Sequence, residues 1–128
     1  MAQLVKQIWI KTDNKPGTLA KVTAPIKDAG VAILAACAWG EGEKANFMIL
    51  TENNGRALES VKKAGFSGEE SEAVSLTLPH KVGALDEAAQ KLGKAGIDIQ
   101  FVYVTAAGPN ALCVLATNNN KKAAEVLG

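Results

Sequence analysis

Hydrophobic and polar residues alternate along several short segments of the chain, a period of two that is typical of half-buried β-strands. In residues 4–12, Ile8 and Ile10 share one face while Gln7, Trp9 and Lys11 share the other. Residues 73–78 repeat this alternation. Four apolar runs of strand length, at 31–39, 45–51, 97–105 and 111–117, are also predicted to be strands. A short further strand is predicted over 66–71.

Apolar residues recur at helical spacing after the first strand of each half of the chain. The stripes are Leu19, Val22 and Ile26 in the first half, and Leu85, Ala88, Ala89 and Leu92 in the second. An Ala-Gly pair follows each stripe, at 29–30 and 95–96, which is a common helix stop. Pro25 lies inside the first of these helices and is expected to kink or shorten it.

A second helix is predicted near the end of each half, where asparagine pairs offer helix N-caps. The candidate caps are Asn53 or Asn54, and Asn119 or Asn120. Leu58, Val61 and Ala64 are expected to form the inward stripe of the first of these helices.

The two halves form an internal repeat. Shifting the sequence by 66 residues places 4–62 on 70–128 without a gap, and 13 of those 59 pairs are identical. Chance at ordinary residue frequencies gives about four. The identical positions include the glycines and asparagines that mark the ends of predicted elements, so the repeat defines the domain organisation.

The sequence therefore predicts an α+β fold of two tandem ferredoxin-like βαββαβ units, each an antiparallel sheet with its helices on one face. The units are 1–68 and 69–128. The second unit has no fourth strand of its own, which leaves an open edge beside 73–78. We expect a strand from the first unit, or from a second chain, to fill that edge. The second and third strands are apolar on both faces, so a sister sheet or another subunit should cover the face without helices.

Composition narrows the possible functions. The net charge of +1 leaves no basic surplus for nucleic acid or an anionic membrane. The longest apolar run, 31–39, is far short of the roughly 20 residues that span a membrane. No signal peptide is recognisable, and Cys37 and Cys113 lie in strand-like runs as expected for buried free thiols, so we predict a cytoplasmic protein.

Catalytic chemistry finds little support. Enzymes commonly use a nucleophile with a base, a carboxylate pair or a metal set, and His80 is the only histidine. Glu69, Glu70 and Glu72 fall in a predicted solvated linker. The sequence contains no CxxC pair, which argues against a metal carrier. Few aromatic residues are available for RNA binding on the sheet. We expect neither enzymatic activity nor a cofactor or metal.

The turn after the first strand, Asp13-Asn14-Lys15-Pro16-Gly17-Thr18-Leu19-Ala20-Lys21-Val22, resembles the signature of the ACT domain family of amino-acid-binding regulatory modules. Residues 29–33 and 95–99 are similar to the family's helix stop and second strand. The resemblance covers both repeats. The second copy, Pro79-His80-Lys81-Val82-Gly83-Ala84-Leu85, departs from it, with Val82 where proline is usual and Pro79 in place of the acidic residue.

The resemblance implies that a small-molecule amino acid binds at the interface between two units, against these turns. The chain would then be a free-standing sensor, acting as a homodimer on a separate regulated partner protein. The implied ligand-binding residues are Asn14, Pro16, Gly17, Thr18, Leu19, Trp39, His80, Val82, Gly83, Ala84, Leu85, Tyr103 and Thr105.

Physical chemistry gives the turns a reason to bind such a ligand. Gly17 and Gly83 allow close backbone approach, and unpaired amides at the following helix N-terminus attract a carboxylate. Asn14 and neutral His80 offer an acceptor to an ammonium group. Each feature also has a purely structural interpretation, since such residues are common in turns and Trp39 could serve packing. A protein-interaction or oligomerisation module without a ligand remains the alternative.

Overall fold

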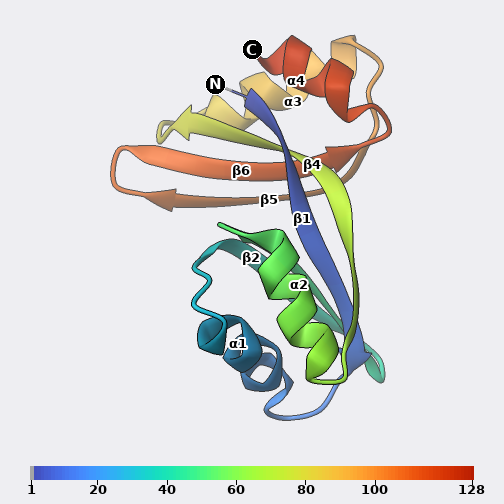
Figure 1. Ribbon diagram of the computed structural model, residues 1–128. Coiled ribbons are helices and arrows are strands. Elements are labelled where there is room, and N and C mark those ends of the chain that lie inside the picture. Colours follow the sequence, from blue (N-terminus) through green and yellow to red (C-terminus); the bar gives the residue numbers. More distant parts are fainter. Residues whose placement is uncertain (1) are drawn as a thin grey trace. The chain divides into compact units, whose positions relative to one another are not determined.

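The computed structural model describes residues 2–128, which form six strands and four helices (Figure 1). The hydrogen-bonded strand order is β2-β3-β1-β4-β6-β5. The strands are β1 (Ala2–Asp13), β2 (Ile33–Glu41), β3 (Lys44–Thr51), β4 (Ser67–Pro79), β5 (Ile99–Ala107) and β6 (Asn110–Thr117). The helices are α1 (Thr18–Asp28), α2 (Asn54–Lys63), α3 (Ala84–Lys94) and α4 (Asn120–Leu127). The α+β class and the two βαββαβ repeats are confirmed.

The chain forms two compact units. The N-unit is Lys6–Ser71, and the C-unit combines Glu72–Gly128 with the residues up to Val5. In the N-unit the strand order is β2-β3-β1-β4, and in the C-unit it is β1-β4-β6-β5. The start of β1 therefore lies beside β4 in the C-unit and occupies the edge that the sequence leaves open. A strand from the first repeat fills this edge, which is one of the two expected solutions.

The segments 66–71 and 73–78, predicted as two strands, are one continuous strand. β4 runs without a break from Ser67 to Pro79, so residue 68, where the repeat suggests a boundary, lies inside it. The glutamates expected in a linker, Glu69, Glu70 and Glu72, are exposed strand residues. Continuity is possible because β1 is itself long enough, at 12 residues, to neighbour both halves of β4.

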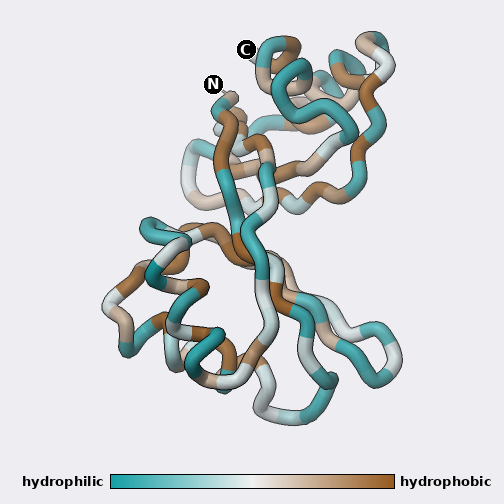
Figure 2. Tube along the Cα trace, turned by 45° about the vertical axis from the view of Figure 1, so that its right-hand side comes forward, coloured by the Kyte–Doolittle hydropathy of each residue, from teal (hydrophilic) through white to brown (hydrophobic). Residues whose placement is uncertain are grey.

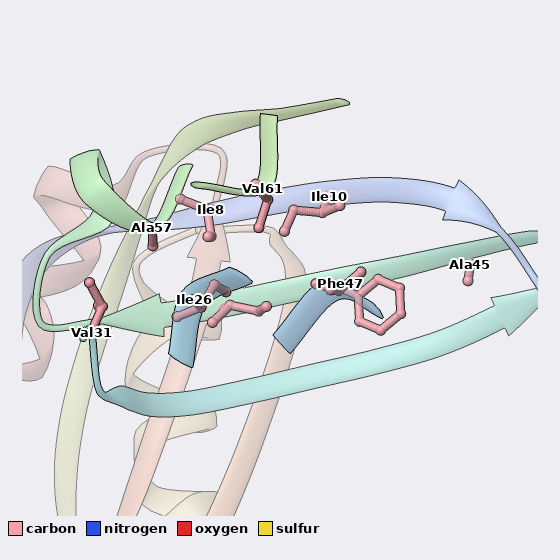
Figure 3. Packing of buried hydrophobic residues seen from close by; sticks show 10 residues of the cluster. Ile8, Ile10, Ile26, Val31, Ala45, Phe47, Ala57 and Val61 are labelled. Atoms are coloured by element: carbon pink, nitrogen blue, oxygen red, sulfur yellow. The ribbon is translucent and has the colours of Figure 1, made fainter. Parts of the chain in front are cut away.

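The N-unit core lies between its sheet and its two helices. Figure 3 shows Ile26 of α1 and Val61 of α2 directed toward Ile8 and Ile10 of β1 and Phe47 of β3, and all five side chains are buried. At roughly 1.5–3 kcal/mol for each large apolar side chain, this burial is the main stabilising term. The alternation in β1 that predicted a half-buried strand is thus explained by one helix-covered face.

The C-unit has a matching core built from β4, β6, α3 and α4. Val74, Leu76, Leu92, Cys113 and Leu115 are all buried in it. Ala2 of β1 packs against the same cluster, in agreement with the place of the first residues in this unit. Burial raises the pKa of the Cys113 thiol, which favours its protonated form. Both cysteines are free, although Cys37 is only half-buried.

Several helix predictions need correction. Leu19 and Leu85 were expected in the inward stripes, but their side chains are 59% and 46% exposed. The cause is their place in the first turn of α1 and α3, next to the loop. Ala89 and Ala64 are also exposed, the latter because it is the residue after α2. Pro25 does not shorten α1, which has the same length of 11 residues as α3 and continues to Asp28, and the Pro25 carbonyl accepts from Ala29 N at 3.0 Å.

The paired asparagines of the repeat have distinct roles. Asn53 and Asn119 are the N-caps, each accepting a backbone N–H three residues ahead at 3.1 Å. The Asn54 side-chain oxygen instead accepts from the Thr51 hydroxyl at 2.7 Å, and its amide nitrogen donates to the Lys6 carbonyl of β1 at 2.6 Å. Asn120 makes the equivalent bonds in the C-unit. One asparagine therefore begins the helix and the next fixes it to a strand.

The helix-free face of each sheet is only partly covered. Met48 and Leu50 of β3 and Val114 and Ala116 of β6 are buried on this face. In contrast, β2 and β5 at the outer edges are largely exposed. Figure 2 shows long hydrophobic stretches along the strands, while the helices alternate between hydrophobic and hydrophilic residues. These edge strands are exposed in the single chain, so their cover by another subunit stays a prediction.

The tight packing of Gly68 generates a testable prediction. A Cβ at this position would lie 3.0 Å from Leu58 Cδ1, 3.3 Å from Ile10 Cγ1 and 3.4 Å from the Trp9 carbonyl oxygen. Overpacking of this kind costs about 1–3 kcal/mol. We expect Gly68→Val to lower the unfolding free energy by that amount in urea denaturation.

Gly93→Ala is the matched control, because Gly93 lies in α3 with nothing within 4 Å of its would-be Cβ. Alanine should stabilise this helix by about 0.5–1 kcal/mol. If Gly68→Val were as stable as the native chain, Gly68 would not be packed this closely against β1 and α2.

Candidate ligand-binding turns

The two turns predicted to bind a ligand have the same backbone geometry. Gly17 precedes α1 with φ 85° and ψ −1°, and Gly83 precedes α3 with φ 88° and ψ −5°. This left-handed conformation favours glycine because a Cβ is poorly tolerated there. Nothing lies within 4 Å of a Cβ built on either glycine, so both turns are open above the backbone. Neither helix receives a side-chain cap hydrogen bond.

Each turn is fastened to the hairpin of its own unit by the same pair of contacts. Asn14 N donates to the Glu43 carbonyl at 2.7 Å, and Asn14 Nδ2 donates to the Gly42 carbonyl at 3.2 Å. In the C-unit His80 N donates to Pro109 O at 2.9 Å, and Nδ1 lies 3.2 Å from Gly108 O. A carbonyl can only accept, so Nδ1 carries the proton and a neutral His80 keeps Nε2 as an acceptor. The two different side chains do the same structural work.

Thr18 has a structural task that the sequence did not reveal. Its hydroxyl donates to the Lys15 carbonyl at 2.7 Å and accepts from Lys15 N at 3.3 Å. The hydroxyl therefore closes the first turn. Ala84, at the matching position, is buried and has no such group. The two turns share a backbone shape that is held in different ways.

The apolar members of the predicted site are exposed around the turns. Val82 is fully exposed, Leu19 and Leu85 are each about half exposed, and Pro16 is exposed as well. Apolar side chains in this position have no core to fill. They remain available to a ligand or a partner surface.

The strand residues of the predicted site lie on the edge strands. Trp39 of β2 is 38% exposed and pairs across the ladder with Asn46. Its neighbour Gly40 approaches Asn14, since a Cβ there would lie 2.5 Å from Asn14 Nδ2. The end of β2 is thus brought to the first turn. On β5 the Tyr103 ring stacks on Phe101, with centroids 6.2 Å apart, and Thr105 is exposed opposite Leu112.

The sequence did not reveal a cluster of interacting side chains, Trp9, Lys11 and Asn46, on the helix-free face of the N-unit. Trp9 Nε1 donates to Asn46 Oδ1 at 3.0 Å, and Lys11 Nζ lies 4.1 Å from the Trp9 ring centroid. Lys44 Nζ lies 2.9 Å from Asp13 Oδ1, and this hydrogen bond and charge hold the pKa of Asp13 below its ordinary value. The alternation in β1 had placed Trp9 and Lys11 on one face. Their partners on β3 could not be identified without the register.

Neither a candidate metal cluster nor a candidate membrane-spanning helix is found among the described residues. Residues 2–128 hold no group of three or more His, Cys, Asp or Glu placed to bind a metal ion. None of the helices described is long and apolar enough to cross a membrane.

The contact between Gly40 and Asn14 can be tested by substitution. Gly40→Ala must displace the Asn14 side chain and break its bond to Gly42, at a cost of about 1 kcal/mol. Asn14→Ala removes the same bond, so the double variant should lose little more than either single variant. Urea denaturation of all three variants measures this coupling. Fully additive losses would mean that the two residues do not meet.

The family model of the ACT domain pair matches residues 3–127, whereas no curated protein matches the sequence. Protein BT0572 from Bacteroides thetaiotaomicron has a similar structure, with a TM-score of 0.92, 25% identity, and coverage of 98% of this chain and 88% of that chain. The ligand-free regulatory subunit of aspartate kinase from Thermus thermophilus has a TM-score of 0.69, 15% identity, and coverage of 98% and 93%.

A further similar fold occurs in E. coli aspartokinase III in complex with lysine and aspartate, with a TM-score of 0.59, 15% identity, and coverage of 98% of this chain and 31% of that chain. At this identity the two kinase structures show the fold alone. The family model, by contrast, describes a pair of ACT domains and spans almost the whole sequence. The chain therefore belongs to the ACT domain pair family, whose domains are regulatory.

Proposed function

We propose that this protein is a non-catalytic sensor that binds an amino acid at its glycine turns and acts on a separate partner protein. The observation that carries the proposal is the pair of open, left-handed glycines, Gly17 and Gly83, each directly before a helix. Membership of a regulatory family supports it. Two free thiols fit a reducing compartment, and a net charge of +1 gives no attraction to nucleic acid, so we place the sensor in the cytoplasm.

The turn offers complementary groups to both ends of an amino acid. The Thr18 and Ala84 amides already donate to the Lys15 and Lys81 carbonyls, at 3.2 Å and 3.3 Å, so a carboxylate would bind to the amides that follow them in the first turns of α1 and α3. At the ammonium end, Asn14 Oδ1 and His80 Nε2 are acceptors whose opposite atoms already hold the hairpin. This division of work orients the acceptor before the ligand arrives.

The remaining predicted contacts would surround the ligand side chain. Pro16, Leu19, Val82 and Leu85 are exposed apolar residues beside the two glycines. The side chains around the two turns differ. The first turn has Thr18 and Trp39, whereas the second has Ala84, Tyr103 and Thr105. The two turns would accordingly differ in ligand preference or affinity.

A thermal-shift series with the twenty amino acids tests this function. Lysine and aspartate come first, because the similar aspartokinase III was solved with both. A ligand at 100 times its Kd stabilises the protein by about 2.7 kcal/mol. For a chain of this size we expect a rise in Tm of roughly 5–20 °C, since each kcal/mol shifts Tm by a few degrees.

Asparagine substitutions locate the binding turn, since asparagine tolerates a positive φ and still places a side chain in the open space. Gly17→Asn and Gly83→Asn should each abolish the shift that arises at its own turn. Gly30→Asn is the control, with φ 73° and equally open surroundings at the end of α1. A shift that survives both turn variants, or no shift with any amino acid, would refute the proposal.

Homodimer formation is a further part of the proposal. Ile99, Val102 and Val104 of the edge strand β5 are each about 40% exposed. Exposed apolar residues on an edge strand favour association with another chain. This observation also supports the second candidate function, an interaction module without a ligand.

Sedimentation velocity tests the dimer. We expect the native chain to sediment as a dimer and Val104→Lys to shift it to monomer, while Gln100→Lys, exposed on the same strand, changes little. A native monomer at micromolar concentration would contradict the dimer. A dimer with no amino-acid response would favour the interaction module.

A further inference from the structure

The N-unit contains a lysine-lined pocket beside the Gly17 turn. It is open, with a volume of about 710 Å³, and lies where the end of β1, the first turns of α1 and the start of β4 meet. Lys11, Lys15, Lys21 and Lys44 line it, against the carboxylates Asp13 and Glu41. Four positive and two negative charges leave +2, twice the surplus of the whole chain.

Most of the positive charge is not neutralised by ion pairs. Asp13 is paired with Lys44, at 2.9 Å. Among the described residues, Lys11, Lys15 and Lys21 make no ion pair with an acidic side chain. Three ammonium groups therefore face one remaining carboxylate, Glu41, around the same space. Such groups repel one another unless an anion lies between them.

The internal repeat shows that the fold does not require these lysines. Sixty-six residues later, Thr77 takes the place of Lys11, Glu87 that of Lys21 and Asn110 that of Lys44. The C-unit nevertheless forms the same turn, with the same backbone bonds to its hairpin. The positive charge is thus an addition of the N-unit.

We infer that this pocket binds a small multivalent anion, one that carries phosphate groups or several carboxylates. Lysine presents compact point charges with rotatable donors, which suit both kinds of anionic group. The volume is within the range of small-molecule sites, roughly 300–1,000 Å³. Lys15 and Thr18 adjoin the Gly17 turn, but binding of the anion needs neither that glycine nor an amino acid.

Trp9 supplies a signal for occupancy. Lys11 lies over its ring and Asn46 accepts its Nε1–H, and both of these residues line the pocket. An anion that draws Lys11 toward itself changes the surroundings of the indole. Binding should therefore alter tryptophan fluorescence in the native chain, and Trp9→Phe should remove that change while leaving the affinity nearly the same.

The experiment titrates the full chain with pyrophosphate and, separately, with citrate, at constant ionic strength set with sodium chloride. Calorimetry gives the Kd and fluorescence gives the location. Lys21→Glu and Lys11→Thr copy the residues of the C-unit, and both positions are exposed, so folding should be unchanged. We expect Lys21→Glu to weaken binding about tenfold or more.

Lys121→Glu is the control, since it makes the same change in net charge on the exposed surface of α4 in the C-unit. It should change the Kd less than twofold. Binding of pyrophosphate alone would identify a phosphate-bearing ligand, and binding of citrate alone a polycarboxylate. Equal weakening by Lys21→Glu and Lys121→Glu, or no binding of either anion at millimolar concentration, would overturn the inference. A loss of the anion site without loss of the amino-acid shift would separate this site from the glycine turns.

Discussion

The sharing of β1 and β4 between two units is the constraint on which the rest of the structure depends. A unit of about 65 residues is near the lower limit for an independent core, and an open sheet edge is a liability. The first residues of β1 complete the C-unit, while the start of β4 completes the N-unit. The C-unit sheet is not finished by its own repeat alone, because its edge strand comes from the start of the chain. The domain organisation therefore follows from strand pairing as much as from the order of the sequence.

Much of this fold could be predicted because the repeat and the alternation report on local structure. Gly17 and Gly83 marked the helix starts correctly, and the asparagine pairs marked the second helices. The continuity of β4 could not be predicted from the sequence. Exposed glutamates within a strand look like a solvated linker when the partner strand is unknown. Leu19 was misassigned for a similar reason: helical spacing gives a face, but only packing shows whether that turn reaches the sheet.

The candidate site was predictable at its backbone and much less so at its side chains. The sequence identified Asn14 and His80 as matching positions, and the structure gives both a tie to the neighbouring hairpin. A side chain that orders a turn and one that binds a ligand look alike in a sequence, because both are short polar groups beside glycine. The hydrogen bond of Trp9 could not be predicted for another reason. Its partner Asn46 is 37 residues away, and their contact depends on the β1–β3 register.

The comparison of the two units separates scaffold from recognition. Their turns share glycine conformation, hairpin ties and the helix that follows, although the side chain at the tie is amide in one and imidazole in the other. The charge around the two turns differs. The N-unit has lysines at 11, 21 and 44, whereas the C-unit has Thr77, Glu87 and Asn110 at the matching positions. Coulombic attraction between exposed groups acts over about 10 Å at physiological salt, so these differences reach any ligand at the turn. Two units with the same backbone therefore present different electrostatic environments, and selectivity between ligands must lie in the side chains around each turn.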